Sequence, residues 1–300
     1  MDRRIRVTML VAPLMMAVTA STTLPASESP EPTPNPYPEI APIAAPIAVG
    51  PQPTPQITAA PILPADPEPT RPITLGSQSW PRQSNGKAVP RATPADLVER
   101  ELPPRPLLPD PESDSFESTI SAIPADVLKR STWRTACPVH HTNLRYLTVT
   151  FWGFDDRPHT GEIIVHKNAA RDIVGVFRRL YDARFPIEEM RVISNHDLYG
   201  PATGDQNITT GFECRPVSGK SRPWSRHSYG YAIDINPFHN PYVKGSLISP
   251  ELSESYTNRR WRRPGMIYRG DAVHRAFSAI GWSWGGSWSS SDDWMHFYRR

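Results

Sequence analysis

Apolar and polar side chains alternate along residues 144–152, LRYLTVTFW, where β-branched and aromatic residues dominate. Residues 161–166, GEIIVH, form a second run of this kind, so we expect a hairpin across the connection GFDDRPHTG. In the following stretch, AARDIVGVFRRLYDARF, apolar residues recur at helical intervals between positions 173 and 180. We predict a helix over residues 169–185, capped by Asn168 and ended by Pro186.

Shorter apolar runs predict three more strands, at residues 187–194, 231–236 and 294–298, and a short helix at residues 271–280. Residues 196–219 are polar and contain several glycines, so we expect irregular structure there. Strands and helices are mixed without a regular β-α-β repeat, and no internal repeat is visible. This order predicts an α+β fold, a small mixed domain with a central antiparallel sheet and a few helices.

Proline content divides the chain into two parts. Of the 36 prolines, 24 lie between residues 21 and 120. Proline has no amide hydrogen and a fixed φ, so neither a helix nor a sheet propagates through such a segment. We therefore predict a disordered, proline-rich linker over residues 21–124. One folded domain is predicted over residues 125–300, which hold eight of the nine tryptophans.

The first 20 residues, MDRRIRVTMLVAPLMMAVTA, combine three arginines with an apolar run that is too short to span a bilayer comfortably. Small residues at positions 18–20 suit a cleavage site, so residues 1–20 are predicted to be a secretory signal peptide. An uncleaved N-terminal anchor is the alternative. No cysteine follows the apolar run, which argues against lipoprotein attachment, and no other segment is predicted to cross a membrane.

The net charge of +3 conceals an asymmetry between the two parts of the chain. Residues 125–300 hold 24 Lys and Arg against 17 Asp and Glu, a balance of +7, whereas residues 21–124 hold 6 against 12, a balance of −6. A basic domain on an acidic linker suits polyanionic surroundings such as a bacterial wall or nucleic acid. The densest basic run is RRWRR at residues 259–263, which is either a solvated loop or a binding site.

Both cysteines, Cys137 and Cys214, lie in the predicted domain. In an exported protein an even pair most simply forms one disulfide, and this is the prediction. A catalytic thiol is the alternative, but no residue near either cysteine in the sequence supplies an obvious base.

Residues with catalytic chemistry gather in two stretches, SRHSYGYAIDIN at residues 225–236 and DDWMHF at residues 292–297. In the first stretch, Ile233 and Ile235 share the apolar face of the predicted strand, while Asp234 projects from the other face. His227 lies on the turn that leads into this strand, close enough to point at the same place.

Two imidazoles and one carboxylate are a donor set of hydrolytic zinc sites, which keep one position open for water. Zinc lowers the pKa of that water, and a second carboxylate beside it is needed to move the proton. His227, Asp234 and His296 fit the ligand roles. Asp293 fits the proton-transfer role, for which Asp292 is the rival.

A serine-hydrolase triad of Ser225, His227 and Asp234 is the other interpretation of the first stretch. It leaves Asp293 and His296 without a role, and Ser225 lacks the strand–turn–helix context of a nucleophile elbow.

The two stretches also carry a resemblance to a known family. SRHSYGYAIDIN matches the S-x-H-x-x-G-x-A-x-D signature of the zinc D-alanyl-D-alanine carboxypeptidases and their L-alanyl-D-glutamate endopeptidase relatives. GWSWGGSWSSSDDWMHF, at residues 281–297, resembles the closing segment of the endopeptidase-like branch, in which the base is aspartate and not the glutamate of the VanX- and VanY-like branches. The resemblance covers residues 131–298. It implies one zinc ion held by His227, Asp234 and His296, with Asp293 as the general base.

The resemblance extends upstream of the first ligand. The segment GFECR, residues 211–215, is similar to the family's Phe-x-x-Arg segment, which implies that Arg215 faces the scissile carbonyl and stabilises a developing oxyanion. A structural salt bridge is the alternative for Arg215. Asp205 and Thr210 lie where relatives place polar residues that face the substrate.

The predicted function is that of a secreted zinc metallopeptidase that hydrolyses peptide bonds in peptidoglycan stem peptides. It would be a D-Ala-D-Ala carboxypeptidase or an L-Ala-D-Glu-type endopeptidase that uses zinc-activated water. We expect a monomer outside the cytoplasm, associated with the cell wall, with no nucleic-acid partner and no stable membrane insertion after signal cleavage.

Two alternatives belong to other classes. A non-catalytic, zinc-containing wall-binding module, like the hedgehog-type domains, would have no need of both Asp293 and Arg215. A nucleic-acid-binding protein built on RRWRR would carry a recognisable motif, and none is present.

Overall fold

The computed structural model describes residues 75–76, 89–105, 107–217 and 223–300. The predicted signal peptide and most of the predicted linker lie outside these residues. The helices are α1 (Ala125–Arg130), α2 (Ala170–Asp182), α3 (Asn195–Tyr199) and α4 (Ala272–Ala279). Short 3-10 helices are η1 (Ala95–Leu97), η2 (His141–Asn143), η3 (Arg226–Tyr229), η4 (Glu254–Thr257) and η5 (Gly285–Ser287). The strands are β1 (Ser118–Ser121), β2 (Leu144–Trp152), β3 (Pro158–His166), β4 (Glu189–Met190), β5 (Ile208–Thr209), β6 (Ala232–Asp234), β7 (Tyr242–Lys244), β8 (Leu247–Ser249), β9 (Ser283–Trp284), β10 (Asp292–Asp293) and β11 (His296–Tyr298).

The α+β class is confirmed, and the strands are distributed over several small sheets. Among the described residues, the antiparallel strands form three sheets of three strands, in the orders β1-β2-β3, β10-β7-β8 and β6-β11-β9, and β4 pairs with β5 in parallel. No strand after residue 223 is longer than three residues. Prolines and glycines recur through that part of the chain, and proline cannot donate to a ladder, so one continuous central sheet does not form there.

The predicted hairpin is confirmed, since β2 spans the predicted residues and pairs along its whole length with β3. Helix α2 is also confirmed, but its N-cap is Ala169 and no side chain caps it, so the predicted Asn168 cap is wrong. The amide of Asn168 instead donates to Nδ1 of His166, as the chain turns out of β3. The first carbonyl of the helix is therefore that of Ala169, which accepts from Ile173.

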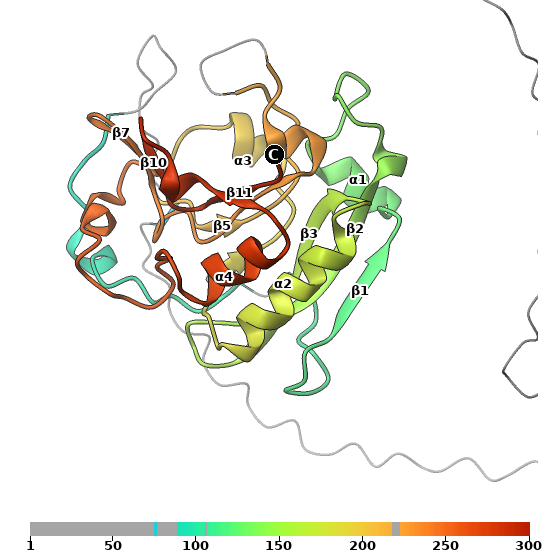
Figure 1. The fold of residues 1–300 in the computed structure, drawn as a ribbon, viewed down its shortest axis with the longest axis horizontal. Coiled ribbons are helices and arrows are strands. Elements are labelled where there is room, and N and C mark those ends of the chain that lie inside the picture. Colours follow the sequence, from blue (N-terminus) through green and yellow to red (C-terminus); the bar gives the residue numbers. More distant parts are fainter. Residues whose placement is uncertain (1–74, 77–88, 106, 218–222) are drawn as a thin grey trace, which may run out of the picture. The chain divides into compact units, whose positions relative to one another are not determined.

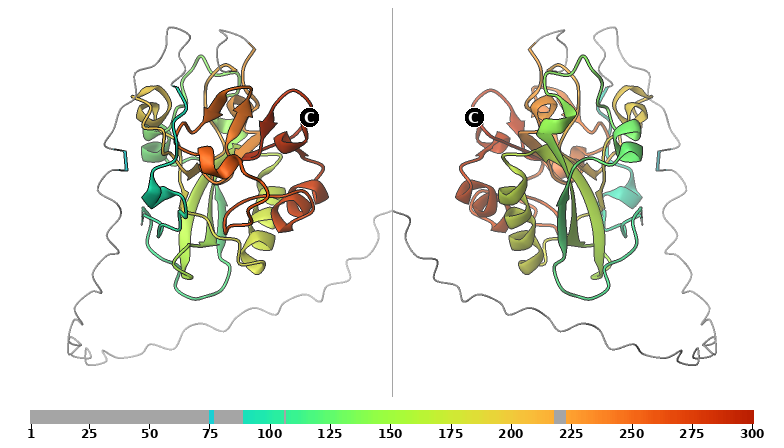
Figure 2. Two further views of the ribbon diagram at one scale, coloured as in Figure 1. Left: turned by 90° about the vertical axis from the view of Figure 1, so that its left-hand side faces the viewer. Right: turned by 90° about the vertical axis from the view of Figure 1, so that its right-hand side faces the viewer.

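Alternate residues of β2 and β3 fill two hydrophobic cores on opposite faces of their sheet. One core packs against α2 and α4 and includes Leu147, Val149, Ile163 and Val165. The other packs against α1 and includes Leu144, Tyr146 and Ile164. Figure 1 shows α2 lying along the hairpin with α4 beside it, and Figure 2 shows α1 on the other side of this sheet.

The folded domain begins earlier than predicted. Strand β1 pairs with β2, and Leu97 of η1 is buried in a third core with Phe238 and Tyr256. Arg100 is only 3 % exposed. The boundary predicted at residue 125 is therefore wrong, and the described residues from 89 onward belong to the domain.

The segment before the metal-site motif is more structured than predicted. Only Glu189 and Met190 of the predicted strand 187–194 form a strand. The supposedly irregular stretch 196–219 contains most of α3, which has a capping box between Ser194 and Asp197, and the short strand β5. No helix in the described part of the chain has the length and apolar character of a membrane span.

Candidate metal centre

Strand pairing brings the two histidine-containing stretches together. Strands β6 and β11 are antiparallel, and their register sets Asp234 directly opposite His296, 62 residues further along the chain. His227 lies in η3, which precedes β6, and its amide donates to the Ser225 side chain at the N-cap. Gly230 follows at φ 70°, a conformation that glycine adopts without strain, and turns the chain into the strand.

The three predicted ligands converge. One ligand atom from each of His227, Asp234 and His296 lies within 4.8 Å of the other two. Nε2 of His227 is 3.2 Å from Nδ1 of His296 and 3.2 Å from Oδ2 of Asp234, and Nδ1 of His296 is 2.8 Å from Oδ1 of Asp234. Ligand atoms of a tetrahedral zinc ion lie about 3.3 Å apart, given metal–ligand distances of about 2.0–2.1 Å. The donor set and its spacing therefore fit one such ion.

A backbone carbonyl orients His227. Its Nδ1 lies 2.6 Å from the carbonyl oxygen of Gly211. A carbonyl can only accept, so Nδ1 carries the hydrogen, and in the neutral ring Nε2 is left with a lone pair toward the cluster. This second contact is typical of metal-binding histidines. Gly211 is required there, because a Cβ atom at that position would lie 2.4 Å from the carbonyl oxygen of Ile164.

The electrostatics of the cluster favour a cation. Burial lowers the pKa of His227, but the charges of Asp234 and Glu213 outweigh burial and raise that pKa to about 9. Burial raises the pKa of Asp234, and the two histidines more than reverse this and hold it well below its usual range. With the hydrogen of a neutral His227 on Nδ1 and Asp234 ionised, Nε2 of His227 and Oδ2 of Asp234 are two acceptors 3.2 Å apart. A proton or a metal ion must therefore lie between them.

Asp293 lies beside this cluster on β10, which pairs with β7. Its Oδ1 is buried and has no hydrogen-bond partner within the described residues. Burial, together with the nearby Asp234 charge, raises the pKa of Asp293 well above its ordinary value, although His227 and Arg215 oppose the rise. The charge of Asp292 instead acts on the Arg259 guanidinium. The structure thus places Asp293, and not Asp292, next to the three ligands.

Arg215 lines a cleft of about 290 Å³ that also reaches Asp234 and Met295. Its Nε donates to Oε2 of Glu213 at 2.6 Å, so the structural salt bridge considered for it is present. About a quarter of its side chain is still exposed. Burial lowers the pKa of Arg215, but the charges of Glu213, Asp234 and Asp293 raise it above its ordinary value, so both site carboxylates act on the guanidinium.

The two residues proposed to face the substrate occupy different environments. Thr210 lines the cleft, and its backbone pairs with that of Asp234 through two hydrogen bonds of 2.9 and 3.0 Å. Asp205 is buried, and its Oδ2 accepts a hydrogen bond of 2.7 Å from the amide of Gly76. A substrate contact stays a prediction for both residues.

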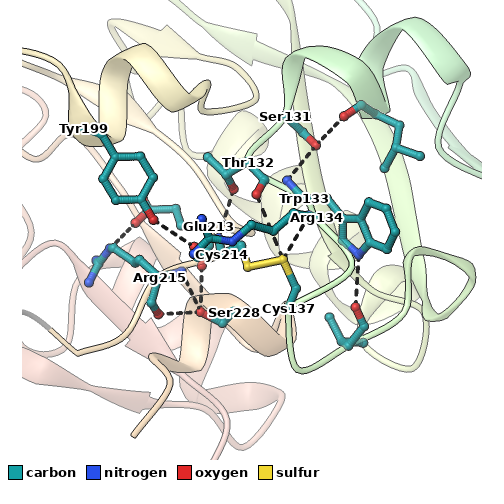
Figure 3. Close-up of a disulfide and its surroundings, with 12 residues drawn as sticks. Ser131, Thr132, Trp133, Arg134, Cys137, Tyr199, Glu213, Cys214, Arg215 and Ser228 are labelled. Atoms are coloured by element: carbon teal, nitrogen blue, oxygen red, sulfur yellow. Dashed lines mark hydrogen bonds and ion pairs between the residues drawn. A yellow bond between two sulfur atoms is a disulfide. The ribbon is translucent and has the colours of Figure 1, made fainter. Parts of the chain in front are cut away.

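The predicted disulfide between Cys137 and Cys214 is present. Figure 3 shows it joining the loop after α1 to the segment that carries Glu213 and Arg215. The same segment is held by Ser228, whose Oγ accepts from the Arg215 amide at 3.0 Å and lies 2.8 Å from the Glu213 carbonyl oxygen. The disulfide therefore anchors the backbone on which the cleft arginine is mounted.

The alternative serine-hydrolase triad does not fit this geometry. Ser225 Oγ accepts from the amide of His227 and caps η3. The ring nitrogens of His227 face Gly211 on one side and Asp234 with His296 on the other.

Three contributors to the site were missed in the sequence: the Gly211 carbonyl, Glu213 and Gly285. A Cβ atom on Gly285 would lie 2.8 Å from Cβ of Asp293 and 3.3 Å from Cβ of His296, so only glycine permits this approach. Two of them, Gly211 and Glu213, lie in the segment GFECR. A backbone carbonyl is present at every residue, so its role as an acceptor cannot be recognised from the residue type.

Two imidazoles, a carboxylate and a second, unpaired carboxylate beside a cleft are the constellation of a metal-dependent hydrolase. Residues 218–299 match a protein-family model described as D-alanyl-D-alanine carboxypeptidase. The match includes His227, Asp234, Asp293 and His296 and confirms the resemblance to the D-alanyl-D-alanine carboxypeptidase family over this part of the chain. It supports a peptidase that acts on peptidoglycan. No curated protein and no solved structure matches the chain.

Proposed function

We propose that this protein is an exported zinc metallopeptidase that hydrolyses peptide bonds in the stem peptides of peptidoglycan. The observation that carries the proposal is the convergence of His227, Asp234 and His296 to within 4.8 Å of one another, with the unpaired carboxylate oxygen of Asp293 nearby. The family match over residues 218–299 supports the substrate class.

The described side chains account for the proton and charge movements of amide hydrolysis. A zinc ion held by His227, Asp234 and His296 would polarise the scissile carbonyl and lower the pKa of water. Asp293 accepts a proton from the attacking water at its carboxylate and returns it to the nitrogen of the leaving amine. Arg215 stabilises the negative charge that develops on the carbonyl oxygen. One amide and one water thereby become a carboxylic acid and an amine.

The cleft provides a path for an extended peptide. Besides Asp234, Arg215 and Thr210, its lining includes residues 202–204, Gln206 and residues 249–251. Its lining combines carboxylate, guanidinium and hydroxyl groups with short apolar side chains, which suits a peptide backbone with polar substituents.

Mass spectrometry of defined stem peptides tests the proposal. The full chain is incubated with purified stem peptides as isolated, after chelation, and after zinc is restored. We expect hydrolysis that chelation abolishes and zinc restores. Loss of a terminal alanine would identify a carboxypeptidase, and internal cleavage an endopeptidase.

Two outcomes would contradict the proposal. Undiminished cleavage after complete removal of metal would exclude a metal-dependent mechanism. Tight zinc binding without any product would instead indicate a non-catalytic wall-binding module.

A further inference from the structure

A basic and aromatic surface lies on the same domain as the candidate metal centre. Residues 258–270 contain five arginines and no aspartate or glutamate. Three of these arginines and the tryptophan of this segment are exposed, and we call these four residues, Arg260, Trp261, Arg262 and Arg269, the basic–aromatic surface. Trp261 keeps 39 % of its area exposed, which is unusual for so large an apolar side chain.

The other two arginines of RRWRR hold this segment in place. Nη1 of Arg259 donates to the carbonyl of His239 at 3.0 Å, and Nη2 donates to that of Ile267 at 2.5 Å. Arg263 stacks on the ring of Trp261 with its Cζ 3.6 Å from the ring centroid. Because these contacts order the loop, Arg260 and Arg262 are presented from a fixed backbone.

The exposed guanidinium groups are not neutralised by neighbouring carboxylates. Arg262 lies over the ring of Tyr268, 4.5 Å from its centroid, and Arg269 donates to Oγ of Ser287 at 3.0 Å. Within the ranges that the structure describes, Arg260, Arg262 and Arg269 form no ion pair with an aspartate or glutamate. Three positive charges are therefore available to an external anion.

The surface is connected to the candidate metal centre through the segment between β9 and β11. Ser287, the partner of Arg269, precedes Trp288, whose ring centroid lies 5.8 Å from that of His296. Arg259 lies over the ring of Trp294, 4.6 Å from its centroid and two residues before the same ligand. A polymer bound along the surface would thus be held close to the cleavage site.

We propose that the basic–aromatic surface binds an anionic, phosphate-bearing polymer of the cell wall. A guanidinium presents paired donors that match phosphate oxygens, and exposed ion pairs are individually weak, so a ligand with repeated charges gains most from this surface. The choice of a wall polymer rests on the proposed function, which places the domain within the wall. Binding there would raise the local concentration of the peptidase next to its substrate.

The test uses the full chain and long-chain inorganic polyphosphate as the probe. The variant Arg260→Ala/Arg262→Ala/Arg269→Ala should bind polyphosphate about tenfold or more weakly, with a shallower dependence on salt, because fewer counterions are released. Arg260→Glu, which reverses one exposed charge, is a second variant and should also weaken binding. Hydrolysis of a short soluble stem peptide should stay at the parental rate in both.

A matched control removes three exposed arginines elsewhere, as Arg134→Ala/Arg157→Ala/Arg171→Ala. It changes the net charge by the same amount and should leave the affinity for polyphosphate within about twofold of the parent.

Equal losses in the two triple variants would overturn the proposal, since net charge alone would then explain binding. Tighter binding of duplex DNA than of polyphosphate through the same arginines would also overturn it, in favour of a nucleic-acid surface. If the parent bound polyphosphate through this surface but hydrolysed no stem peptide, the proposed function would fail, while the binding of a phosphate-bearing polymer by this surface would stand.

Discussion

Replacement of Arg100 by methionine tests whether the chain before residue 125 is part of the folded domain. The guanidinium of Arg100 donates to both carboxylate oxygens of Glu188, at 2.7 and 2.8 Å, and to the carbonyl of Asp205 at 2.8 Å. Its Cζ lies 4.3 Å from the centroid of the Phe238 ring. Methionine can keep much of that packing, but it supplies none of the donors.

The expected loss follows from what remains in the interior. The side chain of Glu188 is 1 % exposed, and after the substitution it would keep the Asn207 side-chain amide, now at 2.6 Å, as a donor but lose the Arg100 cation. Removing one partner of a buried ion pair typically costs about 3–5 kcal/mol, because the other charge stays buried. At about 2–4 °C per kcal/mol for a domain of this size, the unfolding midpoint should fall by about 6–20 °C.

The loss should depend on pH. Burial raises the pKa of Glu188, but Arg100 holds that pKa below its ordinary value. In the parent this depressed pKa contributes stability that is present above the unfolded value of about 4.3 and is lost as the pH falls through the folded value. Without Arg100, burial dominates and the folded pKa rises above the unfolded value. The Arg100→Met variant then regains stability as the pH falls. The difference between the unfolding midpoints of the parent and the variant should therefore become smaller from pH 8 to pH 5. Burial lowers the pKa of the neighbouring His239 to about 4, so this residue stays neutral in the parent over that range.

Thermal unfolding of the full chain, followed by circular dichroism, measures both effects. Arg105→Met, at an exposed position of the same segment, is the control and should change stability by no more than about 0.5 kcal/mol. Arg100→Met/Glu188→Gln should recover part of the loss and remove its pH dependence. An Arg100→Met midpoint that matches the control, or a difference that widens toward pH 5, would refute the buried-pair reasoning.

Three further substitutions test the site and its support. Asp293→Asn should retain zinc, as measured by elemental mass spectrometry. Its kcat should fall at least about a hundredfold, since proton transfer by a positioned carboxylate contributes that much. Turnover at the parental rate would mean that another group is the base. Gly285→Ala brings a Cβ to 2.8 Å from Cβ of Asp293 and should lower kcat at least about tenfold. Its control is Gly175→Ala, where a new Cβ meets nothing within 4 Å, and equal rates in the two variants would contradict the positioning argument. Cys137→Ser/Cys214→Ser removes a disulfide that joins residues 77 positions apart in the sequence. The free energy of unfolding, measured by urea titration, should fall by about 4 kcal/mol. An unchanged urea midpoint would show that the disulfide contributes little.

The metal ligands could be predicted because only a few residue types, histidine and aspartate among them, bind zinc. Histidines and aspartates in two short, recognisable stretches suffice to propose His227, Asp234 and His296. Their meeting depends on the pairing of β6 with β11 across 62 residues, and no local pattern specifies that register. The carbonyl of Gly211, which orients His227, belongs to the backbone, so residue identity does not predict its role. Residue identity therefore predicts which atoms act, whereas tertiary pairing decides how they are held.

The domain boundary could not be predicted because high proline content, which is typical of disordered segments, also occurs in a segment that packs. In this chain Pro94 and Pro124 occupy the N-cap positions of η1 and α1, with φ values of −53° and −58° that proline adopts without strain. Pro104 is buried, close enough to Gly153 to exclude a side chain there. Prolines prevent long helices and ladders, but they do not prevent a segment from packing.

The packed segment also bears on the cleft. The amide of Arg91 donates to the carbonyl of Glu251 at 3.0 Å, and Arg100 binds the carbonyl of Asp205, between Gly204 and Gln206. Glu251, Gly204 and Gln206 all line the cleft beside the candidate metal centre. The N-terminal segment thus holds two loops of the cleft wall through hydrogen bonds to their backbone. A chain that begins at residue 125 would keep all three metal ligands but would lose these contacts, which help to shape the cleft.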